Sequence, residues 1–245
     1  MSPKLSIILT CYNLGAYLKE AVDSVMTYKE QDNVQLIIVN DGSTEKLTLD
    51  VLNKIDLEYK NVIILSQENQ GLAMARNNGI NLAKGNYIIP LDADNKIRHG
   101  FINDAIKILD EEDHIDMVHG NAEFFGKREG IWKVKPFEIS EMVLNNYIDA
   151  CACFRKSVWE RLSGYDTNMP VMGFEDWDFW LRMHRNGFSF KYIDKVFFDY
   201  RVREKSMISN AWEHRNDLIS YIFDKEELHH YKVLRDTLIE NRKLK

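Results

Sequence analysis

Two short acidic motifs in this sequence could bind a metal ion or move a proton. In the first, Asp92-Ala93-Asp94 directly follows the apolar run at residues 88–91. Two carboxylates two positions apart in a turn can face one site, where a divalent cation relieves their mutual repulsion. Hard oxygen ligands favour Mg²⁺ or Mn²⁺, with oxygens of a bound ligand and water completing the shell. The same aspartates, together with Asn95, could instead cap a following helix. The triplet alone leaves both interpretations open.

The second motif, Glu175-Asp176, stands at the start of a helical pattern over residues 175–185. A carboxylate in this place can take a proton from a hydroxyl group as a general base. Negative side chains also stabilise the N-terminus of a helix whatever their chemistry. Taken alone, the pair is better explained as a helix start, so a catalytic interpretation depends on the rest of the chain.

Polar clusters follow three apolar segments that the pattern predicts to be buried strands. The segments are residues 5–9, 34–39 and 87–91, and the clusters are Thr10-Cys11-Tyr12-Asn13, Asn40-Asp41-Gly42-Ser43-Thr44 and Asp92-Ala93-Asp94. In an open α/β sheet, ligands bind outside the carboxyl ends of the strands. Asp-Gly-Ser alone is most often a simple turn. The recurrence of polar clusters at successive strand ends is what predicts a shared site.

Strands and helices alternate along the first half of the chain. Apolar residues at helical spacing predict helices near residues 18–26, 47–55, 72–83 and 101–109, and a further strand is predicted at 62–65. This alternation is typical of right-handed βαβ units. It predicts a Rossmann-like α/β fold, with a mainly parallel sheet and helices on both faces.

The second half shows a different pattern. Short strand candidates separated by glycines occupy residues 117–119, 122–125, 131–134, 188–193 and 196–203. Gly187 is a candidate cap for the helix that begins at Glu175. The end of the chain is helical in pattern and highly charged. We therefore expect one domain over residues 1–205 and a helical C-terminal appendage over residues 206–245.

Composition sets limits on the class of protein. A chain of 245 residues can bury one substantial core, and its net charge of −6 argues against a general nucleic-acid binder. Cys11, Cys151 and Cys153 cannot all pair, and their spacing is not that of a metal-binding cysteine cluster. The N-terminal residues do not resemble a signal peptide, and no apolar run is long enough to cross a bilayer. These features predict a reduced, cytoplasmic protein, either free or at the inner face of the membrane.

Together, the motifs resemble those of family 2 glycosyltransferases, enzymes of the GT-A fold. The matching segments, in the order seen in that family, are Thr10-Cys11-Tyr12-Asn13, Val39-Asn40-Asp41-Gly42-Ser43-Thr44, Asn69-Gln70-Gly71 with Ala75-Arg76-Asn77, Asp92-Ala93-Asp94, and Gly173-Phe174-Glu175-Asp176. The resemblance covers roughly residues 4–205. Co-linear motifs make it specific for the family, though not for one sugar. It implies that residues 1–98 form a nucleotide-binding half and residues 99–205 an acceptor and sugar half.

The resemblance also implies roles on the donor side. Thr10 and Tyr12, in the same loop as Asn13, would border the nucleobase, and Asp41 would bond to its edge, which is uracil in most relatives. From the residues alone, Tyr12 could be a partly buried aromatic residue and Asp41 a turn residue. Arg76 matches a position that contacts the nucleotide or diphosphate, for which bidentate guanidinium geometry is suited. Its alternative is a surface salt bridge.

Asp92, Ala93 and Asp94 match the family's metal and donor-sugar motif. The resemblance implies that Asp94 ligates Mn²⁺ or Mg²⁺, and that Asp92 binds ribose or the donor sugar close to the ion. Many relatives also carry a histidine after the catalytic helix that completes the metal shell. The comparable stretch here, residues 200–206, contains no histidine. We therefore expect Arg201 or Arg203 to contact the diphosphate and the metal to depend on bound nucleotide. A solvated strand end is the alternative for these arginines.

Glu175-Asp176 resembles the family's catalytic acidic pair, with Asp176 as the general base. Inversion of the sugar then needs a single displacement and no covalent intermediate. Trp177, next to the base, is a candidate aromatic platform for an acceptor sugar, although core packing is the likelier role for at least one of Trp177 and Trp180. Asp149 and Gly173 occupy positions that line the acceptor or donor-sugar pocket in relatives.

The function predicted from sequence is transfer of a sugar from a nucleotide sugar, UDP-linked in most relatives, to a hydroxyl of a saccharide or lipid-linked acceptor. A nucleotidyltransferase is disfavoured, because the loop at residues 10–15 has one glycine and no lysine occurs until Lys19. A catalytically silent sugar-binding module is disfavoured because Asp94 and Asp176 are both present. The mixed charges of residues 206–245 leave membrane, partner or oligomer contacts open.

Overall fold

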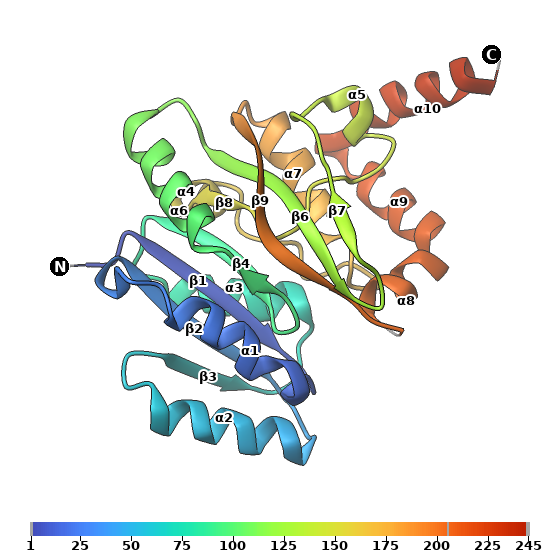
Figure 1. Ribbon diagram of the computed structural model, residues 1–245. Coiled ribbons are helices and arrows are strands. Elements are labelled where there is room, and N and C mark those ends of the chain that lie inside the picture. Colours follow the sequence, from blue (N-terminus) through green and yellow to red (C-terminus); the bar gives the residue numbers. More distant parts are fainter. Residues whose placement is uncertain (1, 205, 244–245) are drawn as a thin grey trace.

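The computed structural model describes residues 2–204 and 206–243. One sheet runs through the molecule in the order β3-β2-β1-β4-β8-β6-β9-β5, with β7 paired to β6 (Figure 1). Its first half alternates strands and helices as predicted. These elements are β1 (Leu5–Cys11), α1 (Gly15–Met26), the short 3₁₀ helix η1 (Gln31–Asn33), β2 (Val34–Asp41), α2 (Lys46–Glu58), β3 (Ile63–Gln67), α3 (Leu72–Leu82), β4 (Tyr87–Asp92) and α4 (His99–Glu111).

The first four strands are parallel, and this places the polar clusters at one edge. β1 pairs with β2 and with β4, and β2 pairs with β3. All residues of β1 and β2 are buried because helices cover both faces of the sheet. Parallel strands present their carboxyl ends on the same side. Thr10 in β1 therefore lies in register with Asp92 in β4.

The second half of the sheet is built differently from the prediction. Its strands are β5 (Lys96–Ile97), β6 (Met117–Gly126), β7 (Gly130–Trp132), β8 (Cys153–Arg155) and β9 (Phe190–Val202). β6 and β9 are each one long strand where the sequence predicted two. They pair in parallel. The register shifts between Gly120 and Ala122, and this irregularity is why the sequence pattern predicted a break in the strand there. β5 and β8 were missed because such short strands show no alternation.

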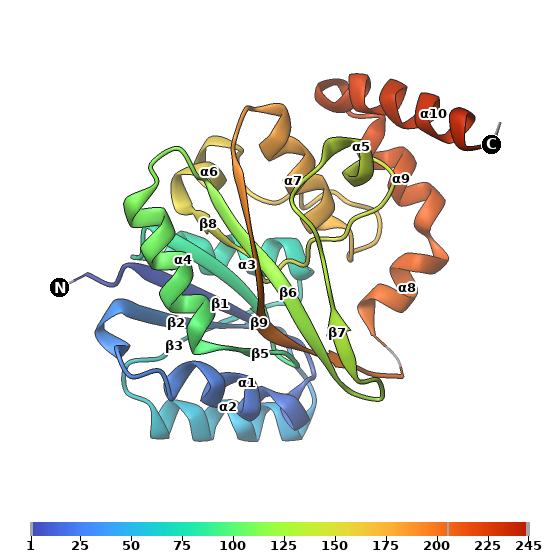
Figure 2. The same ribbon diagram turned by 45° about the horizontal axis from the view of Figure 1, so that its top comes forward.

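Helices cover both faces of the sheet and form two cores (Figure 2). α1, α2 and α4 pack on one face, in a core that also buries the free thiols of Cys11, Cys151 and Cys153. α3 and α7 (Glu175–Arg185) pack on the other face, and α7 has the predicted bounds. Gly187 follows α7 with φ +80°, the left-handed conformation that commonly ends a helix. Two short helices, α5 (Ile139–Met142) and α6 (Lys156–Arg161), connect the strands.

The C-terminal helices α8 (Met207–Glu213), α9 (Arg215–Phe223) and α10 (His229–Lys243), with the 3₁₀ turn η2 (Glu226–Leu228), pack against the second core. Lys225 ties them to α7, because its Nζ lies 2.5 Å from Oδ1 of the buried Asp178 on that helix. The predicted domain boundary at residue 205 falls outside the described ranges. Within those ranges, no helix has the length and apolarity needed to span a bilayer.

Gly79 on α3 offers a test of how closely that helix packs on the sheet. A Cβ at Gly79 would collide with Cγ2 of Ile8 and lie 2.9 Å from Cγ2 of Val39. We expect Gly79→Ala to lower the free energy of unfolding by about 1–3 kcal/mol, despite the better helix propensity of alanine. Urea unfolding measures the change.

Gly100→Ala on α4 is the matched control, because a Cβ there meets no atom within 4 Å. It should be neutral or stabilising by up to about 1 kcal/mol. Equal effects of the two substitutions would contradict the packing explanation.

Candidate active site

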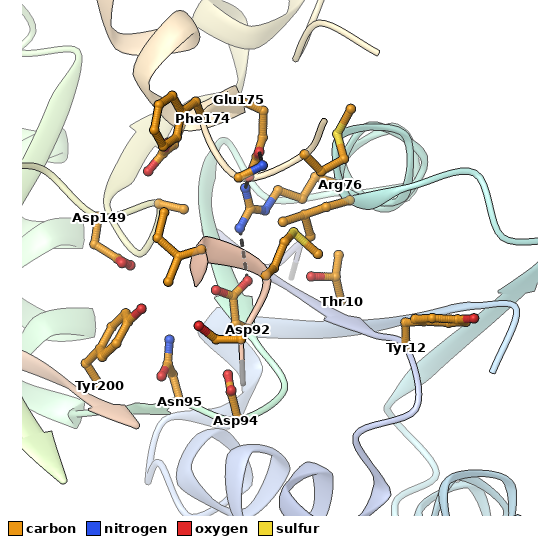
Figure 3. Close-up of a pocket in the computed structure, with 18 of the residues that line it drawn as sticks. Thr10, Tyr12, Arg76, Asp92, Asp94, Asn95, Asp149, Phe174, Glu175 and Tyr200 are labelled. Atoms are coloured by element: carbon orange, nitrogen blue, oxygen red, sulfur yellow. Dashed lines mark hydrogen bonds and ion pairs between the residues drawn. The ribbon is translucent and has the colours of Figure 1, made fainter. Parts of the chain in front are cut away.

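A cleft of about 930 Å³ opens at the carboxyl ends of β1, β2 and β4 (Figure 3). It brings together side chains from both halves of the chain and from the C-terminal helices. Ala93 is fully buried in the β4 turn and does not line the cleft. The other residues that the sequence predicted for the site all line it, namely Thr10, Tyr12, Asn13, Asp41, Arg76, Asp92, Asp94, Asp149, Gly173, Glu175, Asp176, Trp177, Arg201 and Arg203.

The loops after β1 and β2 form one end of the cleft. Tyr12 is 49% exposed and lies well away from the aspartates (Figure 3). Asn13, at φ +52°, accepts hydrogen bonds at Oδ1 from the backbone N–H groups of Thr44 and Glu45, each at 2.9 Å. Asparagine tolerates this left-handed conformation better than most residues. Asn13 therefore holds the two loops together.

Asp41 anchors a third loop to this end of the cleft. Its Oδ1 accepts from the backbone N–H of Gln70 at 2.9 Å and from Nε2 of Gln67 at 2.8 Å. Its Oδ2 accepts from the N–H of Gly71 at 3.0 Å. A carboxylate can accept about four hydrogen bonds, so Asp41 retains capacity for a ligand. It is thus more than a turn residue, because it positions the segment that leads into α3.

Arg76 joins the acidic turn after β4 to the start of α7. Its side chain is 2% exposed, with Nη2 2.9 Å from Oδ1 of Asp92 and Nη1 2.6 Å from Oε1 of Glu175. Burial lowers the pKa of Arg76, but the two carboxylates outweigh it and leave the pKa above its ordinary value. Glu175 also accepts from the N–H of Gly173 at 2.7 Å. The alternative of a surface salt bridge is therefore wrong, since the guanidinium of Arg76 and the carboxylate of Glu175 are both buried.

Arg201 and Arg203, at the end of β9, contact the acidic turn that carries Asp94. Nε of Arg203 lies 2.6 Å from Oδ2 of Asp94 in an ion pair. Arg201 donates from Nε to the backbone oxygen of Asp94 at 3.0 Å, and its own N–H donates to Oδ1 of Asn95 at 3.0 Å. Arg201 also pairs with Glu20. Arg203 is thus the arginine that meets a site carboxylate, whereas Arg201 holds the backbone of the turn.

The acidic turn has the oxygen donors of a hard-metal site but not a complete set. Across residues 2–204 and 206–243, no group of three or more His, Cys, Asp or Glu side chains is arranged to hold a metal ion. Asp92 and Asp94 each use one carboxylate oxygen in an arginine pair, and the other oxygen lies outside that pair. Burial and Asp92 raise the pKa of Asp94, while Arg203 opposes the rise. These two carboxylates fit Mg²⁺ or Mn²⁺ if ligand oxygens and water supply the remaining positions.

Asp176 has the environment of a proton acceptor. Its Oδ2 accepts from Nδ2 of Asn146 at 3.1 Å, and its Oδ1 accepts from the N–H of Trp177 at 2.7 Å. Burial, Glu175 and Asp149 raise its pKa well above the ordinary range. Burial and Asp92 likewise raise the pKa of Asp149 to about 7. Carboxylates with raised pKa values in a cleft are well matched to proton transfer near neutral pH.

Trp177 does not provide the aromatic platform that the sequence suggested. Its side chain is 1% exposed, and its Nε1 donates to the backbone oxygen of Met142 at 2.7 Å. Trp180 is fully buried, and its Nε1 donates to the oxygen of Ile148 at 3.2 Å. Both indoles belong to the second core. This corrects the expectation for Trp177, because a ring packed on all sides has no open face for a sugar.

Several residues of the cleft were missed by the sequence reasoning. Asn146 holds Asp176, and Tyr200 and Trp132 line the wall near Asp149. Trp212 reaches the cleft from α8. Asn146 stands beside a predicted site residue in sequence, which is a weak signal. The others come from strands and helices whose local pattern says nothing about which side chains face a ligand.

Comparison with known proteins places this geometry in a family. The family model described as Glycosyl transferase family 2 matches residues 6–182. An uncharacterized glycosyltransferase of Rickettsia typhi is 30% identical over 224 residues, which cover 86% of this chain and 65% of that protein. An uncharacterized glycosyltransferase of Rickettsia prowazekii is 30% identical over 244 residues, which cover 93% of this chain and 70% of that protein. The chain thus spans 65–70% of the length of these relatives.

Solved structures share the fold at low sequence identity. Staphylococcus aureus TarS in complex with UDP-GlcNAc superposes with a TM-score of 0.74 at 18% identity, over 96% of this chain and 71% of that one. The mannosyltransferase PcManGT from Pyrobaculum calidifontis, in complex with GDP-Man and Mn²⁺, superposes with a TM-score of 0.68 at 17% identity. The match covers 98% of this chain and 74% of that one. Because the family match spans more than half of the chain, the protein belongs to glycosyltransferase family 2 and has the GT-A fold.

Proposed function

We propose that this chain transfers a sugar from a nucleotide sugar, most simply a UDP-sugar, to a hydroxyl of a saccharide or lipid-linked acceptor, with inversion at the anomeric carbon. The observation that carries the proposal is the buried Arg76, which joins Asp92 of the acidic turn to Glu175, the neighbour of Asp176. TarS holds UDP-GlcNAc and PcManGT holds GDP-Man, which supports a nucleotide-sugar donor here.

The donor would occupy the end of the cleft formed by residues 1–98. Thr10 and the half-exposed ring of Tyr12 flank the base, and the spare acceptor capacity of Asp41 is available to its edge. Asp92 and Asp94 would hold Mn²⁺ or Mg²⁺ with the diphosphate, and PcManGT contains Mn²⁺. A bound cation there neutralises charge on the departing diphosphate. Arg203, beside Asp94, supplies a second positive charge for the same group.

Asp176 carries the acid–base step in this proposal. The acceptor hydroxyl gives its proton to an oxygen of Asp176. The acceptor oxygen then bonds to the anomeric carbon, while the bond from that carbon to the diphosphate oxygen breaks and the nucleoside diphosphate leaves. Asn146 orients Asp176, and Glu175, held by Arg76 and Gly173, fixes the start of α7. One displacement inverts the sugar.

Removal of Asp94 tests the metal site. We expect Asp94→Asn to abolish the tightening of UDP binding by Mn²⁺, because the substitution removes a charged oxygen ligand and leaves Arg203 unpaired. Isothermal calorimetry with UDP, with and without Mn²⁺, measures the difference. Asp104→Asn, on the outer helix α4, is the control and should keep the metal effect. Undiminished tightening in Asp94→Asn would exclude the assigned role.

Replacing the base separates binding from chemistry. Asp176→Asn should bind UDP within about twofold of the native affinity but transfer sugar about 10²- to 10⁴-fold more slowly, the usual contribution of a general base. The assay is UDP release in the presence of a nucleotide sugar and an acceptor. Asp113→Asn, an exposed acid outside the cleft, should have the native rate. Full activity in Asp176→Asn would remove Asp176 as the base.

The raised pKa of Asp176 predicts a pH dependence. The base must be deprotonated to act, so kcat/KM should rise with pH through an apparent pKa above the ordinary aspartate value of 3.8. Asp149 is one of the negative neighbours that raise the pKa of Asp176. Asp149→Asn should therefore move the acid limb of the profile to lower pH, while Asp113→Asn should leave it in place. A limb unmoved or moved upward by Asp149→Asn would contradict this coupling.

A further inference from the structure

The cleft has a wall that lies beyond the family match. The match ends at residue 182, whereas Met207, Ile208 and Trp212 on α8 line the same cleft as Asp176. These side chains therefore belong to the C-terminal segment that follows the family match. Trp212 contacts Phe174, two positions before Asp176, so α8 borders the segment that leads to the proposed base.

α8 is packed directly on the catalytic segment. Gly173, three positions before Asp176, has φ +130°, and a Cβ there would lie 2.7 Å from Cβ of Ala211 on α8. Ala211 is fully buried by this contact. Only glycine combines this backbone conformation with such a close approach. The position of α8, and of Trp212 next to Ala211, is thus set by the catalytic segment itself.

Trp212 is an exposed indole held in a defined orientation. Its ring is 49% exposed, yet it meets Phe174 edge-to-face at a centroid distance of 6.1 Å and an angle of 82°. Phe174 in turn contacts Trp177 at 5.5 Å. The guanidinium of Arg215 lies over the Trp212 ring, 5.3 Å from its centroid, and covers part of one face. A half-exposed aromatic ring that lines a cleft in a fixed orientation is suited to stacking with a ligand through the surface that it leaves exposed.

The groups around Trp212 match the chemistry of a sugar. A pyranose ring has an apolar face of C–H groups that packs on an indole, and hydroxyls at its rim that need polar partners. Asn145, Asn146 and Ser206 line the same cleft and offer amide and hydroxyl groups. We propose that Trp212 is the stacking platform for the acceptor, so that the acceptor is recognised as a saccharide ring and not through an apolar aglycone. This inference rests on the proposed function.

Three substitutions of Trp212 distinguish binding that needs an aromatic face from binding that needs only an apolar side chain. Trp212→Phe keeps an aromatic face, Trp212→Leu keeps an apolar side chain without one, and Trp212→Ala removes both. UDP release is measured with UDP-glucose, UDP-galactose and UDP-N-acetylglucosamine, each offered methyl and octyl β-glycosides of the same sugars. We expect the acceptor KM to rise at least about tenfold in the Leu and Ala variants and to stay near native in the Phe variant. The rise in acceptor KM should be equal for methyl and octyl glycosides.

The donor side provides the internal control. UDP affinity should be unchanged in all three variants, because Trp212 is not part of the proposed donor pocket. Val233→Ala, a 55% exposed apolar residue on α10, should leave every parameter native. Thermal unfolding checks that each variant folds.

Two results would overturn the inference. One is a native acceptor KM in Trp212→Ala. The other is a loss confined to octyl glycosides, which would assign Trp212 to an apolar aglycone. If no glycoside stimulates UDP release, saturation-transfer NMR with the methyl glycosides decides: the native protein must show contacts that Trp212→Ala lacks. Failure of the native protein to bind UDP at all is a different outcome, which removes the proposed function and this inference with it.

Discussion

The buried guanidinium of Arg76 is the constraint on which the rest of the site depends. Removing a charge from water is costly unless well-placed opposite charges compensate, and Arg76 is compensated twice, by Asp92 and by Glu175. One carboxylate ends β4 and the other begins α7. The three groups therefore fix the acidic turn after β4 relative to the start of α7. Neither carboxylate can move far without leaving a buried charge unpaired.

This arrangement would also let an acidic chain bind the negatively charged donor that we propose. The cleft gathers the carboxylates of Asp92, Asp94, Asp149, Glu175 and Asp176. Arginines pair with Asp92, Asp94 and Glu175, but they relieve the repulsion only in part. The pKa values of Asp94, Asp149 and Asp176 all stay above the ordinary aspartate value. The residual negative charge favours a bound cation at one end and a proton acceptor at the other. Net charge of the whole chain says little about such a local balance.

The sequence predicted best what depends on local pattern. Strands buried on both faces read as apolar runs, so β1, β2 and β4 and the polar residues after them could be placed, and α7 was placed to the residue. The sequence-based predictions failed where tertiary contacts determine strand length or the burial of a side chain. A register shift lets β6 continue through Gly120, and local composition cannot show whether Arg76 is exposed or buried. The same limit led to the wrong expectation for Trp177, because only packing shows which indole in a helix is covered.

The position of α8 suggests how one catalytic framework can serve a particular acceptor. The segment with the proposed base lies within the family match, and the α8 side chains that line the cleft lie after it. Lys225 anchors the C-terminal helices to Asp178 of α7, and Arg235 on α10 donates to the backbone oxygen of Val143, close to the loop of Asn146. The segment that would recognise the acceptor is thus fixed to α7, the helix of the proposed base. Exchange of its side chains can alter recognition while the chemistry beneath it stays in place.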